Sequence, residues 1–196
     1  MKEKIILTDC DGVLLNWEYA FHTWLETHGH TRKVEDVGLY YDISRQYGMD
    51  RPQLWELIKT FNESAAIGFL PPLRDAVYYI KKLHEQHGYV FHVISSLSLD
   101  ESAGKLRTRN LEKLFGENVW HGFTYLDTGE DKDRGLLPWK GHDLYYVEDK
   151  YENAMCAYKY GLTGILMEHG HNMHITNIPK YLNWKGIYTF LTGENE

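Results

Sequence analysis

Short apolar runs alternate along this chain with segments whose apolar positions recur every three or four residues. Compact apolar runs predict buried strands, whereas a spacing of three and four predicts helices with one face against a core. The predicted strands are residues 4–8, 89–94, 119–126, 144–147 and 163–167. The predicted helices that follow them are residues 73–87, 102–115, 151–160 and 184–191. This alternation favours an α/β fold, a Rossmann-like parallel sheet with helices on both faces.

One long stretch interrupts the alternation, because no convincing strand lies between residues 8 and 73. Residues 17–28 and 52–61 have helical patterns, and Asp50 stands where the second of these helices needs an N-cap. A structureless loop of this length is improbable in a compact domain. We therefore predict two parts. Residues 1–15 and 70–196 form the α/β core, and residues 16–69 form a small α-helical cap over the end of the sheet where ligands bind.

Charge and composition exclude several classes of protein. The formal net charge is −7 and the isoelectric point is about 5.9, whereas a general nucleic-acid binder should be basic. No apolar stretch approaches the roughly 20 residues of a membrane span, and no signal-peptide pattern opens the sequence. Two cysteines are too few for a disulfide framework. We expect a cytoplasmic protein with no membrane and no stable nucleic-acid partner, and the sequence does not indicate its oligomeric state.

The segment that follows the first predicted strand carries two aspartates, Asp9 and Asp11, followed by Gly12. Residues two apart in an extended chain point the same way, so the two carboxylates should share one pocket while Cys10 faces away as a small buried hydrophobe. Two close carboxylates repel each other unless a proton or cation lies between them, and Mg²⁺ takes oxygen ligands. Alone, these residues also fit a turn with solvated aspartates.

Three further features lie at the ends of predicted strands. Ser95 and Ser96 close the second strand, where hydroxyl groups can hold phosphate oxygens. Glu148 and Asp149 close the fourth strand, where acidic groups are costly unless they are solvated or bound to a metal. Lys140 lies just before that strand and could neutralise both a phosphate and a carboxylate nucleophile.

In their order along the chain, these residues resemble the four motifs of the haloacid-dehalogenase-like (HAD) phosphatases. The motifs stand here as Asp9-x-Asp11-Gly12-Val13, Ser95, Lys140 and Glu148-Asp149, and the resemblance covers the whole chain. Residues 16–69 look like the helical first-type cap of that superfamily. Residues 69–77, the strand ending in Ser95-Ser96 and residues 183–187 look most like the 5′(3′)-deoxyribonucleotidase branch and related phage-type proteins.

The resemblance implies a catalytic role for each aspartate of the first motif. Asp9 would attack phosphorus and form an aspartyl-phosphate, and Asp11 would protonate the leaving oxygen and then activate the hydrolytic water. Ser95, with Ser96 beside it, and Lys140 would hold the phosphoryl oxygens. Lys140 is preferred to Lys132 and Lys105 because its spacing fits the family best.

The resemblance also implies Mg²⁺ as the cofactor. Its ligands would be the Asp9 carboxylate, the Asp11 backbone carbonyl and the pair Glu148-Asp149. This pair is Glu-Asp rather than Asp-Asp. We therefore expect Asp149 to contact the metal directly, and Glu148 either to lie in the outer coordination shell or to share the contact.

The expected function is that of a Mg²⁺-dependent phosphomonoesterase, a 5′(3′)-nucleotidase acting on nucleoside monophosphates. Trp17, the cap aromatic nearest the catalytic turn, is expected to stack on the base. The alternatives are a phosphatase for another small phosphate ester, a phosphatase for nucleic-acid 3′ ends, and a non-catalytic metal- and phosphate-binding module. The acidic charge and the cap disfavour the 3′-end phosphatase. The presence of Asp11 disfavours the binding module and a dehalogenase, because neither phosphate binding nor carbon–halogen displacement needs an acid at this position.

The segment of residues 168–174 contains three histidines and follows the last predicted strand. We interpret it first as a polar loop near the site and second as a substrate contact. A zinc site ranks third, because tight zinc binding needs about four ligands in a defined geometry.

Overall fold

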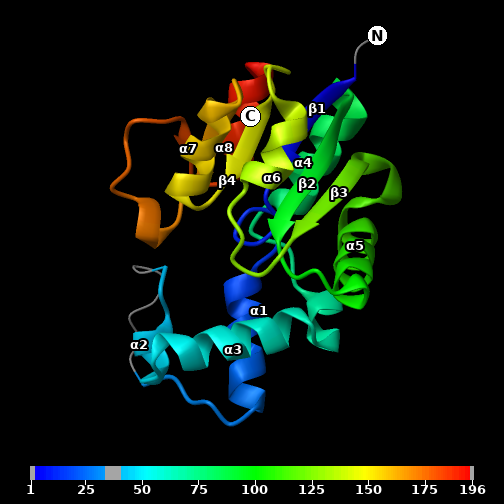
Figure 1. The fold of residues 1–196 in the computed structure, drawn as a ribbon. Coiled ribbons are helices and arrows are strands. Elements are labelled where there is room, and N and C mark those ends of the chain that lie inside the picture. Colours follow the sequence, from blue (N-terminus) through cyan, green and yellow to red (C-terminus); the bar gives the residue numbers. More distant parts are fainter. Residues whose placement is uncertain (1–2, 34–40, 195–196) are drawn as a thin grey trace.

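The computed structural model describes residues 3–33 and 41–194 of the 196-residue chain. Its centre is a six-stranded parallel sheet with the strand order β3-β2-β1-β4-β5-β6 (Figure 1). The strands are β1 (Lys4–Thr8), β2 (Tyr89–Ser96), β3 (Trp120–Leu126), β4 (Tyr145–Glu148), β5 (Thr163–Met167) and β6 (Lys180–Tyr181). The predicted α/β fold is confirmed, and only the two-residue β6 is too short to leave a pattern in the sequence.

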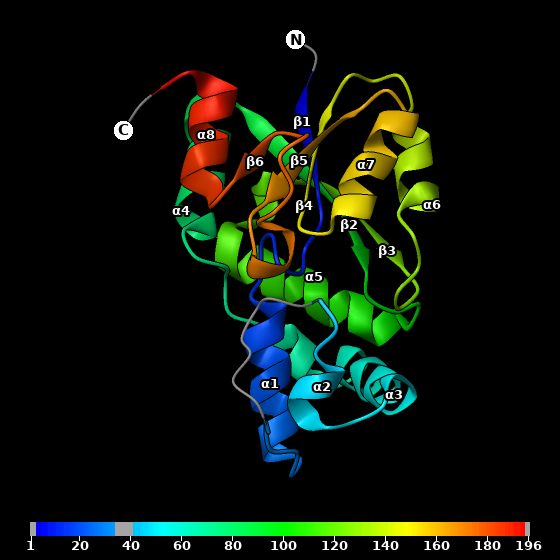
Figure 2. The ribbon, with the colours of Figure 1, turned by 90° about the vertical axis from the view of Figure 1, so that its left-hand side faces the viewer.

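Helices cover both faces of this sheet (Figure 2). They are α4 (Ala76–His87), α5 (Glu101–Phe115), α6 (Asp133–Leu136), α7 (Tyr151–Lys159) and α8 (Trp184–Thr192). Because side chains alternate along a strand, Ile6 of β1 packs with α4, α5 and α8, while its neighbour Leu7 packs with α6 and α7. Both faces of each central strand are therefore buried, which explains the continuous apolar runs in the sequence.

The two ends of α4 show how local chemistry corrects one predicted helix boundary and confirms the other. Helix α4 begins at Ala76 rather than at the predicted Leu73, because Arg74 has a φ angle of 43°, which an α-helix does not allow. The same helix ends at His87 and is capped by Gly88, whose left-handed φ of 71° matches the predicted C-terminal glycine. In the part of the chain that the structure describes, four short 3₁₀ turns lie in the connections: η1 (Ala65–Phe69), η2 (Glu117–Val119), η3 (Leu137–Trp139) and η4 (Gly170–Asn172).

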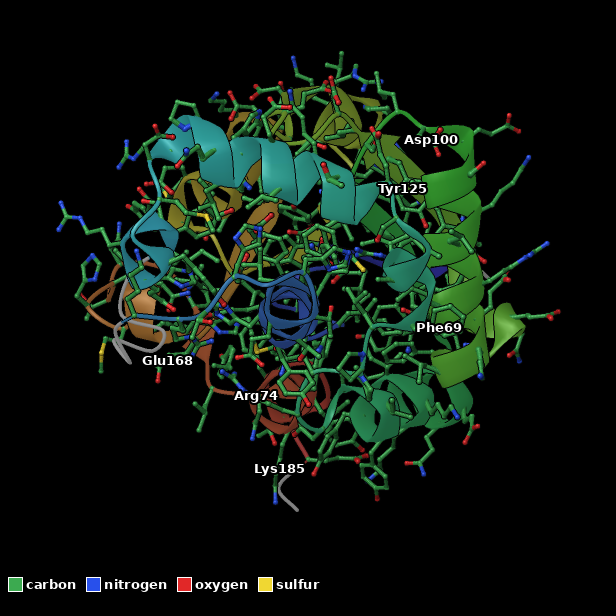
Figure 3. All side chains as sticks on the ribbon, turned by 90° about the horizontal axis from the view of Figure 1, so that it is seen from below. Phe69, Arg74, Asp100, Tyr125, Glu168 and Lys185 are labelled. Carbon is green, nitrogen blue, oxygen red and sulfur yellow. The ribbon has the colours of Figure 1, made fainter. Side chains whose placement is uncertain are left out.

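The described residues of the segment predicted to form a cap, 16–33 and 41–69, lie beyond the carboxyl ends of the strands (Figures 1 and 2). They contain α1 (Trp17–Thr27), α2 (Ser44–Tyr47) and α3 (Arg51–Asn62), and Figure 3 shows them from below. Asp50 caps α3 as predicted, in a capping box with Gln53. Phe21 of α1 and Phe61 of α3 pack with their ring centroids 5.2 Å apart.

Several predictions about the whole chain stay open. Residues 34–40 of the predicted cap lie outside the described residues, and the division into core and cap stays a prediction. None of the helices within residues 3–33 and 41–194 is long and apolar enough to cross a membrane. The cytoplasmic location also stays a prediction.

Candidate active site

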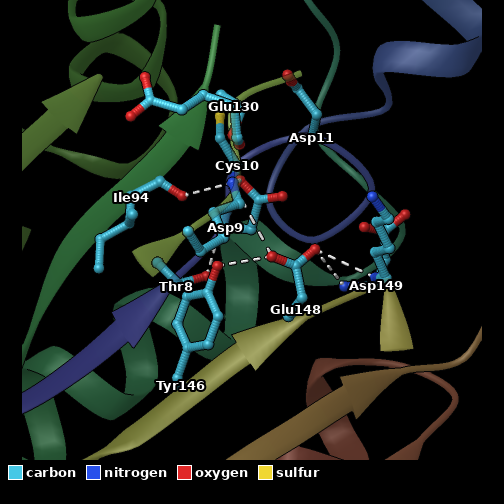
Figure 4. A network of polar contacts seen from close by, with 12 residues as sticks. Thr8, Asp9, Cys10, Asp11, Ile94, Glu130, Tyr146, Glu148 and Asp149 are labelled. Atoms are coloured by element: carbon cyan, nitrogen blue, oxygen red, sulfur yellow. Dashed lines mark hydrogen bonds and ion pairs between the residues drawn. The ribbon is translucent and has the colours of Figure 1, made fainter. Parts of the chain in front are cut away.

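Three carboxylates, of which Asp9 and Glu148 are buried and Asp149 is partly exposed, meet at the carboxyl ends of β1 and β4 (Figure 4). Asp9 follows β1, Glu148 ends β4, and Asp149 comes next. Each offers a carboxylate oxygen, and these oxygens all lie within 4.8 Å of one another. Adjacent parallel strands bring their carboxyl ends to one edge, which is why residues 139 positions apart converge.

The lysine at this cluster is Lys132, whereas Lys140, which the sequence spacing favoured, lies outside the cluster. Lys132 is buried, and its Nζ donates to Asp9 Oδ1 at 2.9 Å and to the Ile94 carbonyl at 3.0 Å. The same Nζ lies 3.9 Å from Glu148 Oε2. Lys140 is exposed at the end of η3, and Lys105 is exposed on α5, where it pairs with Glu101 at 2.7 Å.

The short helix α6 explains the difference between the two lysines. Lys132 immediately precedes this helix, and Leu136 on its last turn is anchored in the apolar layer between the sheet and α7. The helix therefore turns Lys132 toward the strand ends and leaves Lys140 on the surface. Four residues are too few to show a helical period, so spacing along the chain favoured a lysine that lies outside the cluster.

The electrostatics of the cluster fit a divalent cation. Burial, followed by the nearby Glu148 charge, raises the pKa of Asp9 to about 8. Burial also raises the pKa of Glu148 and of Asp149 to about 7 in each case. One buried lysine faces this group of three carboxylates, so a second positive charge would keep all of them ionised. Oxygen donors are the ligands that Mg²⁺ prefers.

The hydrogen bonds indicate which carboxylates would hold the ion. Glu148 Oε1 accepts the backbone N–H groups of Asp149 and Lys150, both at 3.1 Å, and its Oε2 accepts the Tyr146 hydroxyl at 2.6 Å. Asp9 uses only Oδ1, for Lys132 and for the N–H of Cys10. Asp9 Oδ2 and the Asp149 carboxylate are therefore more available to a metal ion than the Glu148 carboxylate is. This arrangement favours the expectation that Asp149, rather than Glu148, contacts the metal.

Gly12 and the histidine loop bring the two acidic segments together. A Cβ on Gly12 would lie 2.5 Å from Asp149 Oδ2, and its φ of 73° is left-handed, so the close approach requires glycine. His169 Nε2 donates to the Gly12 carbonyl at 2.7 Å, and His171 Nε2 donates to the Asp149 carbonyl at 3.1 Å. These histidines bridge the backbone of the site, as a polar loop beside it would.

The side chains of the histidine loop do not belong to the group of three metal-binding residues found in the described part of the chain. Among residues 3–33 and 41–194, the group formed by Asp9, Glu148 and Asp149 is the one that brings three metal-binding side chains together. His174 is exposed. The described residues therefore give the zinc interpretation no support.

The two serines differ in what their hydroxyl groups can do. Ser95 is buried at the edge of the cavity, and its Oγ has no hydrogen-bond partner in the part of the chain that the structure describes. Ser96 Oγ already donates to the Glu130 carbonyl at 2.7 Å. A buried hydroxyl without a partner is unfavourable, so Ser95 is the one available to a ligand.

Asp11 shares the cavity with Asp9, and it forms an ion pair with Arg107 from α5. Figure 4 shows its side chain pointing away from the Glu148 carboxylate. Sequence reasoning missed Arg107. The signal was present, because Arg107 lies four residues from both Ala103 and Leu111 on the buried face of α5. A charged residue at such a position is a candidate for a buried partner.

A cavity of about 410 Å³ opens above these groups. Its floor is the polar cluster, and its roof comes from the predicted cap. The apolar side chains of the roof are Trp17, Tyr41, Ile43, Leu54, Trp55 and Ile58. Trp17 lines the cavity, and its Nε1 donates to Asn62 Oδ1 at 3.0 Å. Trp55, which was not predicted, lies so close to Gly129 that a Cβ there would be 2.1 Å from its ring.

Comparison with known proteins shows the fold. No protein-family model matches the chain. Over 114 residues, or 56% of this chain, it is 29% identical to an uncharacterized 32.4 kDa protein from the Gp30–rIII intergenic region of Enterobacteria phage T4. The match spans 40% of the length of that relative.

Solved structures of HAD-superfamily hydrolases share the architecture. One of subfamily IA from Geobacter sulfurreducens has a TM-score of 0.63 and 13% identity, with 96% of each chain covered. The D,D-heptose 1.7-bisphosphate phosphatase of B. bronchiseptica, complexed with magnesium and phosphate, has a TM-score of 0.55 and 11% identity, with 98% of this chain and 99% of that chain covered. An L-2-haloacid dehalogenase has a TM-score of 0.59 and 12% identity, with 97% and 100% covered. This chain therefore has the fold of HAD-superfamily hydrolases.

Proposed function

We propose that this chain is a Mg²⁺-dependent phosphomonoesterase that acts through an aspartyl-phosphate on Asp9. The observation that carries the proposal is the buried cluster in which Lys132 contacts Asp9 beside Glu148 and Asp149. Bound by Asp9, Asp149 and the Asp11 carbonyl, Mg²⁺ would supply the positive charge that a phosphate dianion needs there.

The side chains account for each step of this reaction. Lys132 and the free Ser95 hydroxyl hold phosphoryl oxygens. An Asp9 oxygen attacks phosphorus, the ester P–O bond breaks, and Asp11 donates a proton to the leaving oxygen. Asp11 then takes a proton from water, whose oxygen attacks phosphorus and releases Asp9 and phosphate.

For the substrate we propose a nucleoside monophosphate. The cavity combines a charged floor with an aromatic and apolar roof, which suits a phosphate joined to a flat group. In this proposal residues 16–69 act as a cap that excludes polymers, so nucleic-acid ends are poor substrates. A dehalogenase would need no acid at Asp11, and a binding module would need none either.

The first prediction concerns removal of the metal. Hydrolysis of p-nitrophenyl phosphate should be lost in EDTA and restored by added Mg²⁺, because three clustered carboxylates repel a phosphate dianion without a cation. The measurement is the rate of nitrophenolate release before chelation, in EDTA and after Mg²⁺ is returned. Full turnover in EDTA would contradict the proposed cofactor.

The second prediction concerns the base of the nucleotide. Trp17→Ala should lower kcat/KM for a nucleoside monophosphate relative to p-nitrophenyl phosphate by roughly 5- to 150-fold, which corresponds to the 1–3 kcal/mol of one base–aromatic stack. Trp24→Ala is the matched control, because Trp24 packs on the same Phe21 but does not line the cavity. If sugar phosphates are the better substrates and Trp17→Ala is neutral, the nucleotide proposal is wrong while the phosphatase proposal stands.

A further inference from the structure

A fully buried arginine lies behind the active site. The Arg107 side chain has 0% of its surface exposed, and it reaches from the middle of α5 to the turn after β1. Its Nη1 donates to Cys10 Sγ at 3.0 Å and to Asp11 Oδ1. Its Nε and Nη2 have no hydrogen-bond partner among residues 3–33 and 41–194.

We infer that Arg107 is the positioning residue for Asp11, and this inference rests on the proposed function. A guanidinium does not lose its proton in a protein, so a buried arginine needs a carboxylate beside it. Within the described residues, Asp11 is the carboxylate that forms an ion pair with Arg107. Their contact therefore fixes the direction of the Asp11 side chain from inside the core.

The pair connects the core with the cavity. The Asp11 side chain is 24% exposed and lines the cavity, whereas Arg107 has no exposure at all. Every hydrogen bond or ion pair that Asp11 forms through its carboxylate to a described residue uses Oδ1. Oδ2 is thereby left for the proton that passes to the leaving oxygen or comes from water. A proton donor held in one orientation is in place for many turnovers without the cost of ordering it each time.

Helix α5 is held in place by contacts other than Arg107. Asp100 caps its first turn through the Ala103 N–H at 2.7 Å. Near its last turns, Asn110 accepts from the Leu70 N–H at 2.9 Å and donates to the Leu70 carbonyl at 3.2 Å. Conservative replacement of Arg107 should therefore leave the helix in position, and its consequences should appear at Asp11.

The test separates positioning of the acid from a general loss of structure. The quantity kcat/KM covers the steps up to the aspartyl-phosphate. In those steps an alkyl phosphate needs a proton on its leaving oxygen, whereas p-nitrophenyl phosphate releases a stable anion. Arg107→Met should lower kcat/KM for glycerol phosphate by about 10- to 100-fold more than for p-nitrophenyl phosphate, part of the roughly 10²–10⁴ that general acid catalysis supplies. Arg107→Lys should restore part of the loss.

A double-mutant comparison completes the experiment. Asp11→Asn should show the same selective loss, and Arg107→Met should add nothing to it if Arg107 acts through Asp11. Arg109→Met, an exposed position on the same helix, is the control and should match the wild type. Equal losses for both esters, a further loss in the Asp11→Asn background, or a gain in either single Arg107 variant would overturn the inference. If the wild type hydrolyses neither ester, the proposed function itself fails, and the inference falls with it.

Discussion

Asp9→Asn is expected to abolish hydrolysis of every phosphate ester while leaving the protein folded. The loss in kcat should be at least about 10⁴-fold, within the range seen when a nucleophile is removed. An amide is not nucleophilic, but its oxygen can still accept from Lys132 and from the N–H of Cys10. Because burial and the Glu148 charge raise the pKa of Asp9 to about 8, losing this carboxylate relieves repulsion, so the melting temperature should not fall.

The matched control for this substitution is Asp143→Asn. Asp143 is exposed, and its φ of 53° is a left-handed conformation that asparagine also tolerates, so both stability and turnover should be unchanged. The two variants are compared by kcat for p-nitrophenyl phosphate and by thermal unfolding. Trapping a phosphorylated chain in acid from the wild type, but not from Asp9→Asn, would locate the intermediate. Near-normal turnover by Asp9→Asn would rule out the covalent role.

What the sequence could predict here is mostly local. The apolar runs of β1, β2 and β5 are buried on both faces, so each is visible without knowledge of its neighbours. Asp9, Ser95 and Asp149 lie beside strand ends, and parallel strands bring such ends to one edge of a sheet. The convergence of these residues therefore followed from topology alone.

The residues that sequence reasoning missed, or named only as an alternative, reach the site from outside the strand ends. Lys132 enters because α6, a helix of four residues, turns it inward. Arg107 enters through the packing of α5 under the turn after β1, and Trp55 enters where α3 meets Gly129. Each contact joins elements far apart in the chain, and spacing along a sequence carries no information about such packing.

The choice between the two lysines gives the sharpest test of the site. Lys132→Met should lower kcat/KM for p-nitrophenyl phosphate by at least about 10³-fold, because removal of one electrostatic donor from a buried site costs about 10²–10³ and Lys132 also neutralises the nucleophile. Lys140→Met should have no effect, since Lys140 is exposed and lies outside the cavity. Both substitutions remove one ammonium group and keep a flexible side chain, so the two variants differ only in where the lost lysine lies in the structure.

The same two variants should also differ in conformational stability. Lys132 is the buried partner of Asp9 and lies near Glu148, so removing it leaves carboxylates without a counter-charge, and breaking such a pair costs about 3–5 kcal/mol. Lys132→Met should therefore unfold at a clearly lower urea concentration than Lys140→Met. Because a bound ion stabilises the folded state that holds it, Mg²⁺ should raise the midpoint of both variants. Turnover lost in Lys140→Met but kept in Lys132→Met would show that the phosphoryl group is held by the lysine expected from spacing alone, and that the buried Lys132 only balances charge.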